Sequence, residues 1–333
     1  MSTEATLAHT INCASLNGMG TYPTIGVISL NWNGFSWTEQ MLHALLKNDY
    51  PGRVEILIVD NGSREQEGKR LKELFGDAIT LRQHEKNEGF TGGNNLAITQ
   101  LLENPVIAAV VLLNNDTIPD PHFLTALVDT WQETGAELVA TTMRSLDNPD
   151  EIDNLGITLT RGLLPFNRKN ENAPLFCPSG GCVLYSRHFI ETLLQKDGYF
   201  FDPRFFAYAE DLDVGFRARE YGFKIAIATG AIVLHKGSAS TAPMSDFAVG
   251  QTYRNLVWVL AKHLSLRAFL WWLPKIIAAH ALLIGFHIMR GKPHVILRAY
   301  GRGIFKLPAF LRERKNCMTV RELRSCTHPG LFV

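Results

Sequence analysis

The chain has 333 residues, of which 46% are hydrophobic and 20% are charged, and its formal net charge is +1. This composition excludes a disordered chain, and the length suits one large α/β domain with an appendage or two domains.

Neither the N-terminus nor the cysteines indicate export. Residues 1–23 contain no basic start followed by an apolar run, so we predict no secretory signal and expect a flexible segment. The five cysteines are odd in number and form no CxxC pair, which argues against a disulfide framework. We therefore expect a reducing, cytosolic compartment.

The first half of the chain alternates between strand and helix patterns. Segments 24–32 and 54–63 are typical of buried strands that end in polar residues, with helical spacing in between. Further helical stretches precede and follow residue 85, and 106–117 is another apolar strand. This alternation predicts a mainly parallel sheet between helical layers, with ligands at the carboxyl ends of its strands.

The charge is uneven along the chain. Residues 262–315 hold eleven Lys and Arg against one acid and carry +10, whereas residues 1–261 carry −10. Within the apolar and aromatic region 253–315, residues 268–289 are long enough to cross a bilayer, but Pro274, Lys275, His280 and His287 interrupt them. An in-plane or re-entrant helical region on anionic lipid suits this composition better; a helical cap on the α/β body is the alternative.

Two motifs at predicted strand or helix ends carry polar groups. NEGFTGGNN (87–95) is neither a dinucleotide fingerprint nor a P-loop; its glycines either let backbone N–H groups approach a diphosphate or sugar, or make a turn. Asn114-Asn115-Asp116 follows a strand, and side chains i and i+2 share one side of its end, where they can reach a divalent cation. An Asx-type turn is the alternative.

Three acids, Glu210, Asp211 and Asp213, follow a run of aromatic residues. Acids are favoured in the first turn of a helix, and Gly222 is placed to end such a helix. Capping explains one or two acids, but three raise one another's pKa unless a cation or a proton is shared. For this segment alone, structure and chemistry are equally good interpretations.

The ordered set SLNWNG, VDNGS, NEGFTGGNN, LLNNDT, SGGCVLYSR, FFAYAEDLDVGFRARE and VLHKGSAS resembles the inverting family 2 glycosyltransferases with the GT-A fold, and most of all their rhamnosyltransferase-like branch. The resemblance covers about residues 24–260. It implies a three-layer α/β/α nucleotide-sugar-binding domain, which we expect at 24–252. Composition predicts that a membrane-associated helical region at 253–315 and a tail at 316–333 follow it.

The resemblance also implies site residues. Asp60 would hold the nucleotide base or ribose, and the rest of the donor pocket would be Asn31, Asn33, Asn87, Gly89, Asn94, Asn114 and Asn115. Asp116 would bind Mg²⁺ or Mn²⁺ as the acid of a DxD-type motif, with help from His235, although a lone His at a strand end is more often structural. Asn114 replaces the first acid of that motif and leaves fewer anionic ligands.

In an inverting transfer the acceptor hydroxyl loses its proton as it attacks the anomeric carbon, and a carboxylate within reach takes that proton. The resemblance implies that Asp211 is this base and that Glu210 positions the acceptor, whereas Asp213 is structural. The acceptor or sugar pocket would comprise Ser179, Gly180, Gly181 and Tyr208.

The implied function is metal-dependent transfer of a sugar, rhamnose from dTDP-rhamnose, to a lipid-linked or polysaccharide acceptor in bacterial surface-glycan synthesis. The protein would lie on the cytoplasmic face of the cell membrane, and no nucleic-acid partner is expected. One alternative is a nucleotidyltransferase, but NWNGFSWTEQ lacks the basic residue usual after its first strand. The other is a non-catalytic membrane scaffold, which predicts no donor binding.

Overall fold

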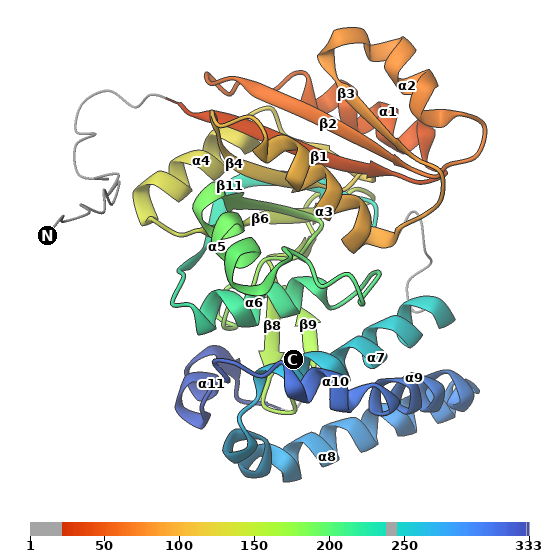
Figure 1. Cartoon of the computed structure of the whole chain (residues 1–333), viewed down its shortest axis with the longest axis vertical. Coiled ribbons are helices and arrows are strands. Elements are labelled where there is room, and N and C mark those ends of the chain that lie inside the picture. Colours follow the sequence, from red (N-terminus) through yellow and green to blue (C-terminus); the bar gives the residue numbers. More distant parts are fainter. Residues whose placement is uncertain (1–21, 238–244, 331, 333) are drawn as a thin grey trace, which may run out of the picture.

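The computed structural model describes residues 22–237, 245–330 and 332 (Figure 1). The expected flexible segment 1–23 and the end of VLHKGSAS therefore lie almost wholly outside the described residues. The centre of the fold is a nine-stranded sheet of order β3-β2-β1-β4-β10-β6-β11-β5, with β7 paired to β6. Its strands are β1 (Thr24–Asn31), β2 (Val54–Asn61), β3 (Thr80–His84), β4 (Ile107–Leu113), β5 (Thr117–Pro119), β6 (Leu138–Ser145), β7 (Ile152–Asn154), β10 (Cys182–Ser186) and β11 (Ile225–His235).

The sheet combines parallel and antiparallel pairings, and β6 pairs in parallel with β11. β1 pairs in parallel with β2 and β4, and β2 with β3, as the alternation of strands and helices predicts. However, β10 is antiparallel to both β4 and β6, and β5 is antiparallel to β11. The prediction missed this because the chain enters β10 from an excursion through β7, β8 and β9 and not through a crossover helix.

Helices cover both faces of the sheet, so the expected three-layer α/β/α architecture is confirmed. On one face α1 (Phe35–Leu45), α2 (Glu67–Phe75) and α4 (Phe123–Thr134) pack against strand residues such as Val27. On the other face α3 (Gly89–Leu102), α5 (Arg187–Asp197) and α6 (Glu210–Glu220) pack against residues such as Ile28. Successive strand side chains point to opposite faces, and each face therefore has its own core. A short 3₁₀ helix, η1 (Gly76–Ala78), follows α2.

Helices from the C-terminal part lie below α6 in Figure 1, beside a small second sheet of order β12-β8-β9. The helices are α7 (Asp246–His263), α8 (Leu266–Met289), α9 (Pro293–Phe305), α10 (Leu307–Arg312) and α11 (Val320–Cys326), and the strands are β8 (Ile157–Thr160), β9 (Pro165–Asn167) and β12 (Thr327–His328). A third hydrophobic core joins Phe216 of α6 to Trp258 of α7 and Phe310 of α10.

Two boundaries expected from composition look different in the structure. The expected domain boundary at 252–253 falls inside α7, which runs without a break from Asp246 to His263. The expected tail 316–333 contains α11 and β12, and β12 pairs in parallel with β8. Both boundaries were placed where composition changes, but packing against α6 and β8 continues across them.

Candidate active site

The carboxyl ends of β1 and β2 meet in a hydrogen-bonded cluster. Asn31 donates from Nδ2 to Ser63 Oγ at 3.0 Å and to Glu67 Oε2 at 2.9 Å. Asp60 accepts the backbone N–H groups of Ser63, at 3.2 Å, and of Gly68, at 3.0 Å. Both predicted donor-site side chains are buried and fix the loop between β2 and α2. Asn33 is exposed at this edge and accepts the Arg64 N–H through Oδ1 at 2.9 Å.

The glycine-rich motif joins the start of α3 to the loop before α6. Helix α3 begins at Gly89, so Gly92 and Gly93 lie inside the helix and not in a turn before it. Asn87 Oδ1 accepts the Gly89 N–H at 2.8 Å, and Asn94 donates to the Phe90 carbonyl at 2.9 Å. Gly89 has φ +75°, and a Cβ there would lie 2.4 Å from the carbonyl oxygen of Phe206. A side chain at position 89 would therefore displace the loop before α6, to which Phe206 belongs.

The Asn114-Asn115-Asp116 motif lies between β4 and β5. The Asn114 N–H donates to the Gly181 carbonyl at 2.8 Å, and Asn115 Nδ2 donates to Thr38 Oγ1 at 3.0 Å. The Thr117 hydroxyl closes a turn by donating to the Asn114 carbonyl at 2.5 Å. A turn is therefore present here, but its bond comes from the Thr117 side chain and not from an Asn or Asp side chain as in an Asx-type turn. Asp116 lies within this turn.

Asp116 and His235 lie together, as the sequence predicts for a shared site. Pairing of β5 with β11 sets Thr117 opposite His235, and His235 Nε2 lies 3.5 Å from Asp116 Oδ1. The other ring nitrogen, Nδ1, lies 2.8 Å from Asp153 Oδ2. Burial opposes the charged ring, but the two carboxylates raise the pKa of His235 to about 9. Asp153, on β7, was not singled out from the sequence.

A divalent cation fits this edge only in part. The described residues contain no group of three or more His, Cys, Asp or Glu side chains placed to hold a metal ion. Asp116, with an imidazole beside it, matches the way in which Mg²⁺ is held by one or two carboxylates together with substrate phosphates. These residues therefore fit a cation that shares its coordination with a bound diphosphate, and do not form an all-protein cage.

The Ser179-Gly180-Gly181 turn lies against the acidic motif. The Gly180 N–H donates to Asp211 Oδ2 at 3.3 Å, and Ser179 Oγ accepts the Gly181 N–H at 3.5 Å. Asp211 Oδ1 accepts the Leu212 N–H at 2.8 Å in the first turn of α6. Two motifs separated by some thirty residues are thus in direct contact.

The carboxyl groups of Glu210 and Asp211 have different pKa values although the two residues are neighbours. Asp211 is partly exposed; burial raises its pKa to about 6, against the opposing effect of the Gly180 and Leu212 N–H groups. Glu210 is only 6% exposed, and burial together with the Asp211 charge raises its pKa well above the usual range. A pair of carboxyls whose pKa values are set by different environments is typical of acid/base sites. Burial thus acts more strongly on Glu210, and Asp211 is the stronger acid of the two.

The loop before α6 has a strained backbone. Phe206, Tyr208 and Ala209 have φ values of +65°, +70° and +65°. Left-handed conformations cost of order 1 kcal/mol or more for residues with side chains and persist only where surrounding structure imposes them. Here the fully buried Asn255 of α7 donates from Nδ2 to the carbonyls of Phe205, Ala207 and Tyr208, at 3.1, 2.9 and 2.7 Å.

Asn255 was missed because residues after 253 were interpreted as a membrane-associated region or a helical cap, and none of them as part of the site. Its neighbour Arg254 donates to the Phe205 carbonyl at 3.0 Å, and the Thr91 N–H donates to that of Phe206 at 3.1 Å. The available signal was an Arg-Asn pair within an otherwise apolar helical stretch. Helix α7 thus contributes to the site even though it lies outside the predicted motifs.

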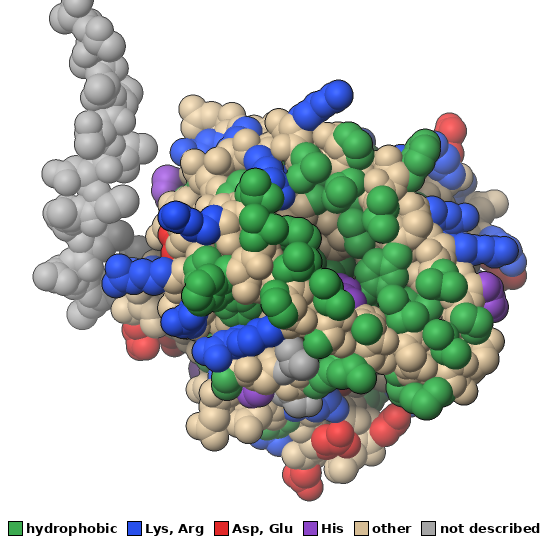
Figure 2. All heavy atoms as spheres, turned by 90° about the horizontal axis from the view of Figure 1, so that it is seen from below, with side chains coloured by type: hydrophobic (Ala, Val, Ile, Leu, Met, Phe, Trp, Pro, Cys, Tyr) green, Lys and Arg blue, Asp and Glu red, His purple; other side chains and the backbone are tan. Residues whose placement is uncertain are grey.

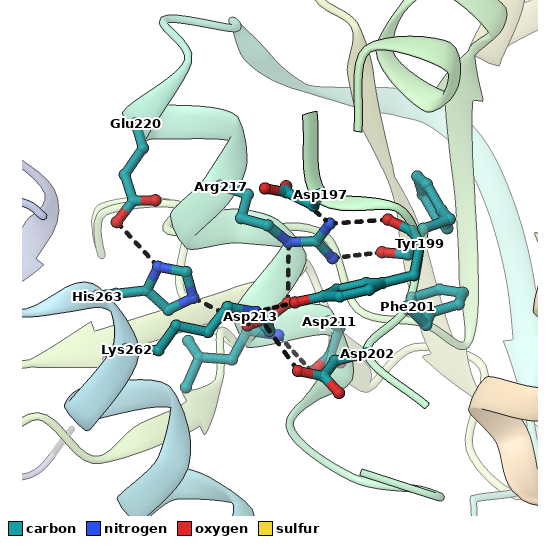
Figure 3. A network of polar contacts seen from close by, with 12 residues as sticks. Asp197, Tyr199, Phe201, Asp202, Asp211, Asp213, Arg217, Glu220, Lys262 and His263 are labelled. Carbon is teal, nitrogen blue, oxygen red and sulfur yellow. Dashed lines mark hydrogen bonds and ion pairs between the residues drawn. The ribbon is translucent and has the colours of Figure 1, made fainter. Parts of the chain in front are cut away.

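Asp213, the third acid, is the centre of a buried ion network (Figure 3). Its Oδ2 accepts from Arg217 Nε at 2.9 Å, and its Oδ1 accepts from Lys262 Nζ at 2.7 Å. The ring of His263 contacts the same carboxylate at 2.8 Å and Glu220 at 2.8 Å. Burial opposes its charge, but Lys262 and Arg217 hold the pKa of Asp213 well below its usual range. Asp213 therefore ties α6 to α7, which supports its structural interpretation.

A mixed sheet of this kind, with polar strand ends and an acidic helix start beside them, is the architecture of a GT-A glycosyltransferase domain. The sequence profile of the family described as "Glycosyltransferase like family 2" matches residues 23–257. The chain belongs to this family.

Relatives with described roles are distant. The hexosyltransferase Agl10 of low-salt glycan biosynthesis, from Haloferax volcanii, is 26% identical over 190 residues, which cover 54% of this chain and 59% of Agl10. This chain thus spans less than two thirds of the length of that relative.

Solved structures share the fold at low identity. GalNAc-T7, solved with UDP, GalNAc and Mn²⁺, has a TM-score of 0.58 at 16% identity and covers 78% of this chain and 51% of its own. TarS of S. aureus has a TM-score of 0.51 at 18% identity, and the match covers 72% of this chain and 39% of the TarS chain. The mannosyltransferase PcManGT from Pyrobaculum calidifontis, solved with GDP-Man and Mn²⁺, has a TM-score of 0.52 at 16% identity, with 87% and 76% covered.

Proposed function

We propose that the protein is an inverting glycosyltransferase that moves a sugar from a nucleoside-diphosphate donor to an acceptor hydroxyl, with Asp211 as general base. The observation that carries this proposal is the placement of Asp211: it is partly exposed in the first turn of α6, accepts the Gly180 N–H, and follows a loop that Asn255 fixes. Burial raises its pKa to about 6. Membership of glycosyltransferase family 2 supports the reaction class.

The proposed mechanism assigns a role to each carboxyl. Asp211 accepts the proton of the acceptor hydroxyl as the oxygen attacks the anomeric carbon, which typically accelerates such a step by about 10²–10⁴-fold. A base with a pKa near 6 is unprotonated at pH 7 yet still basic enough to take a proton. Burial raises the pKa of Glu210, which favours its neutral form and limits negative charge beside the base; its predicted contact with the acceptor stays a prediction.

Asp116, with His235 beside it, would hold Mg²⁺ or Mn²⁺ in this proposal. When bound, the cation stabilises negative charge on the departing diphosphate. Mn²⁺ in the structures of GalNAc-T7 and PcManGT supports a divalent cation here. His235 could share the cation only as the neutral imidazole, so binding of the cation would release the proton that Asp116 and Asp153 favour on this ring.

For the donor we propose dTDP-rhamnose, on the strength of the seven motifs in their order. TarS was solved with UDP and with UDP-GlcNAc, and PcManGT with GDP-Man, so these nucleotides are the competing donors. The donor pocket proposed at the β1, β2 and β4 ends includes Asn31, Asp60 and Asn114. Asn33 is its most exposed member.

The acceptor we propose is a glycan, polyprenyl-linked or already polymerised, in bacterial cell-surface synthesis on the cytoplasmic face of the cell membrane. The basic and apolar character of residues 253–315 supports a membrane location. The role of Agl10 in glycan biosynthesis supports the acceptor class.

The first experiment is thermal unfolding of the full chain with dTDP, UDP, GDP and ADP and their sugars, each with and without Mg²⁺ or Mn²⁺. A ligand at about 100 times its Kd stabilises a fold by roughly 2.7 kcal/mol, which is measurable. A cation-dependent shift with one nucleotide is expected, followed by sugar transfer with inverted anomeric configuration in NMR spectra of the product. Absence of any nucleotide shift would overturn the transferase proposal, and a retained configuration would overturn the role of Asp211.

A further inference from the structure

Helix α8 is apolar on both of its long faces. One face is buried in the C-terminal core through residues at helical spacing: Ala268, Trp272, Ile276, Ala279, Leu283 and His287. Most helices of soluble proteins are polar on the opposite side. The rest of the α8 surface exposes Leu270, Trp271, Ile277, Leu282, Phe286 and Ile288, with Trp271 63% exposed.

The polar residues that interrupt this run in the sequence mostly face the protein. His280 Nδ1 lies 2.5 Å from the Tyr300 hydroxyl of α9, and the His287 ring lies edge-on to Tyr253 of α7. Burial lowers the pKa of both histidines, so they are neutral inside the core. The outward side of α8 is therefore more apolar than the sequence alone indicates.

The exposed apolar surface continues onto α9 and α10. Nineteen large hydrophobic side chains are exposed in the described residues, and twelve of them lie between Leu266 and Leu311. We call the exposed side chains of 266–312 the basal face. Figure 2, which views the molecule from below, shows green hydrophobic side chains spread across this side, with Lys and Arg near its edges. Apolar patches of this extent mark interaction sites.

The charge of the basal face indicates which kind of partner binds there. Residues 264–312 contain eight Lys and Arg and no Asp or Glu. Seven of these bases are exposed, and Lys292 pairs with Asp246. Apolar and aromatic side chains surrounded by cations, without a carboxylate, match the boundary between acyl chains and anionic headgroups. The occupant is therefore an anionic lipid bilayer.

The packing of α8 against α9 indicates whether α8 lies in the plane of the bilayer or crosses it. Among the described helices, α8 is the one long and apolar enough to cross. However, the contact of His280 with Tyr300 packs the middle of α8 against the middle of α9, where Arg298 and Arg302 flank Tyr300 and are exposed. A crossing α8 would carry these two charges into the hydrocarbon, which is unfavourable.

We infer that the basal face binds an anionic bilayer with α8 and α9 in the plane of the membrane surface. Apolar side chains such as Trp271 enter the acyl boundary, and Arg298, Arg302 and their neighbours contact headgroup phosphates. Delivery of a polyprenyl-linked acceptor from that surface to Asp211 rests on the proposed function, whereas the binding itself does not.

Flotation of the full-length protein with vesicles tests this inference. Vesicles of phosphatidylcholine with one quarter phosphatidylglycerol should bind the protein, and pure phosphatidylcholine much less. Trp271→Glu should lower the partition coefficient by about tenfold or more, and Arg298→Gln by about fivefold on anionic vesicles only. Val106→Glu, at a residue 57% exposed in the loop before β4, is the matched control and should bind as the parent does. Equal binding of Trp271→Glu and the parent would overturn the inference.

Depth measurements separate in-plane from crossing helices. In a Trp271→Phe background, Leu282→Trp places an indole at the middle of α8. Lipids brominated high on the acyl chain should quench this indole as strongly as they quench Trp271 in the parent. Strongest quenching by bromines at the chain ends would show a crossing helix and overturn the in-plane arrangement.

The thermal shifts with donor nucleotide keep the two proposals apart. Trp271→Glu should retain the nucleotide shift and transfer to a short soluble acceptor, and lose transfer to a vesicle-borne acceptor. Vesicle binding without any nucleotide shift would support membrane binding by the basal face and overturn the transferase proposal. A nucleotide shift without vesicle binding would support the transferase proposal and overturn the inference that the basal face binds a bilayer.

Discussion

The side-chain amide of Asn255 donates to the carbonyl oxygen of Tyr208 at 2.7 Å, and Tyr208 lies in the loop that leads into α6, where Asp211 is found. One buried residue on α7 thereby sets the backbone from which the proposed base projects. Removing it leaves three buried carbonyl oxygens without this donor, because the amide also reaches Phe205 and Ala207.

Asn255→Leu should lower kcat by about 10–100-fold, a larger change than in donor KM, because Asn255 contacts the loop that precedes the base and displacement of the base by an ångström is costly. Stability should fall by about 1–3 kcal/mol through the unsatisfied carbonyls. Leu193→Ala, in the core under α5, is the control: it should lose as much stability or more and keep its kcat. Equal kcat values for Asn255→Leu and the control would refute a positioning role.

Asp211→Asn should keep the shape of the site and lose the base. We expect donor binding, measured by thermal shift, to be unchanged and turnover to fall by about 10²–10⁴-fold. Glu191→Gln, an exposed carboxylate on α5, is the matched control and should turn over normally. Normal turnover of Asp211→Asn would show that another group accepts the proton.

The pH dependence of kcat/KM should report the same carboxylate. The base acts only when unprotonated, and burial raises its pKa from 3.8 to about 6. Activity should therefore be complete well above pH 6, fall tenfold for each unit below it, and have its midpoint near 6 and not near 4. Initial rates between pH 4.5 and 8, corrected for unfolding, provide the measurement. A flat profile down to pH 4.5 is the result that contradicts the assignment.

Lys262→Met should destabilise the protein by about 3–5 kcal/mol, because it leaves the buried Asp213 carboxylate with fewer cations. Adding Asp213→Asn to it should restore part of this loss, since the uncompensated charge is then gone. Chemical denaturation of the parent, both single variants and the double variant gives the coupling energy. If the losses in unfolding free energy of the two single variants add up in the double variant, the 2.7 Å contact between Lys262 and Asp213 contributes nothing to stability.

Local patterns predicted the layers and the strand ends, because hydrophobic period and strand polarity are properties of neighbouring residues. They placed Asn31, Asp60, Asp116 and His235 at one edge of the sheet, and the structure brings Asp116 and His235 within 3.5 Å. The contacts with Asn255 and Asp153 connect residues distant in sequence, and no periodicity encodes such partners. The antiparallel β10 was missed for the same reason: its neighbours β4 and β6 are set by topology.

The pairing of β12 with β8 has a practical consequence for producing the protein. Thr327 and His328 pair with Leu159 and Thr160, and the Arg161 N–H donates to the His328 carbonyl at 3.0 Å. Leu323 and Cys326 of α11 are buried in the core that α8 shares. Trimming the chain before residue 320 would therefore uncover apolar surface and an open strand edge, the two features that most promote aggregation. Affinity tags and fluorescent fusions belong at the opposite end of the chain, ahead of β1.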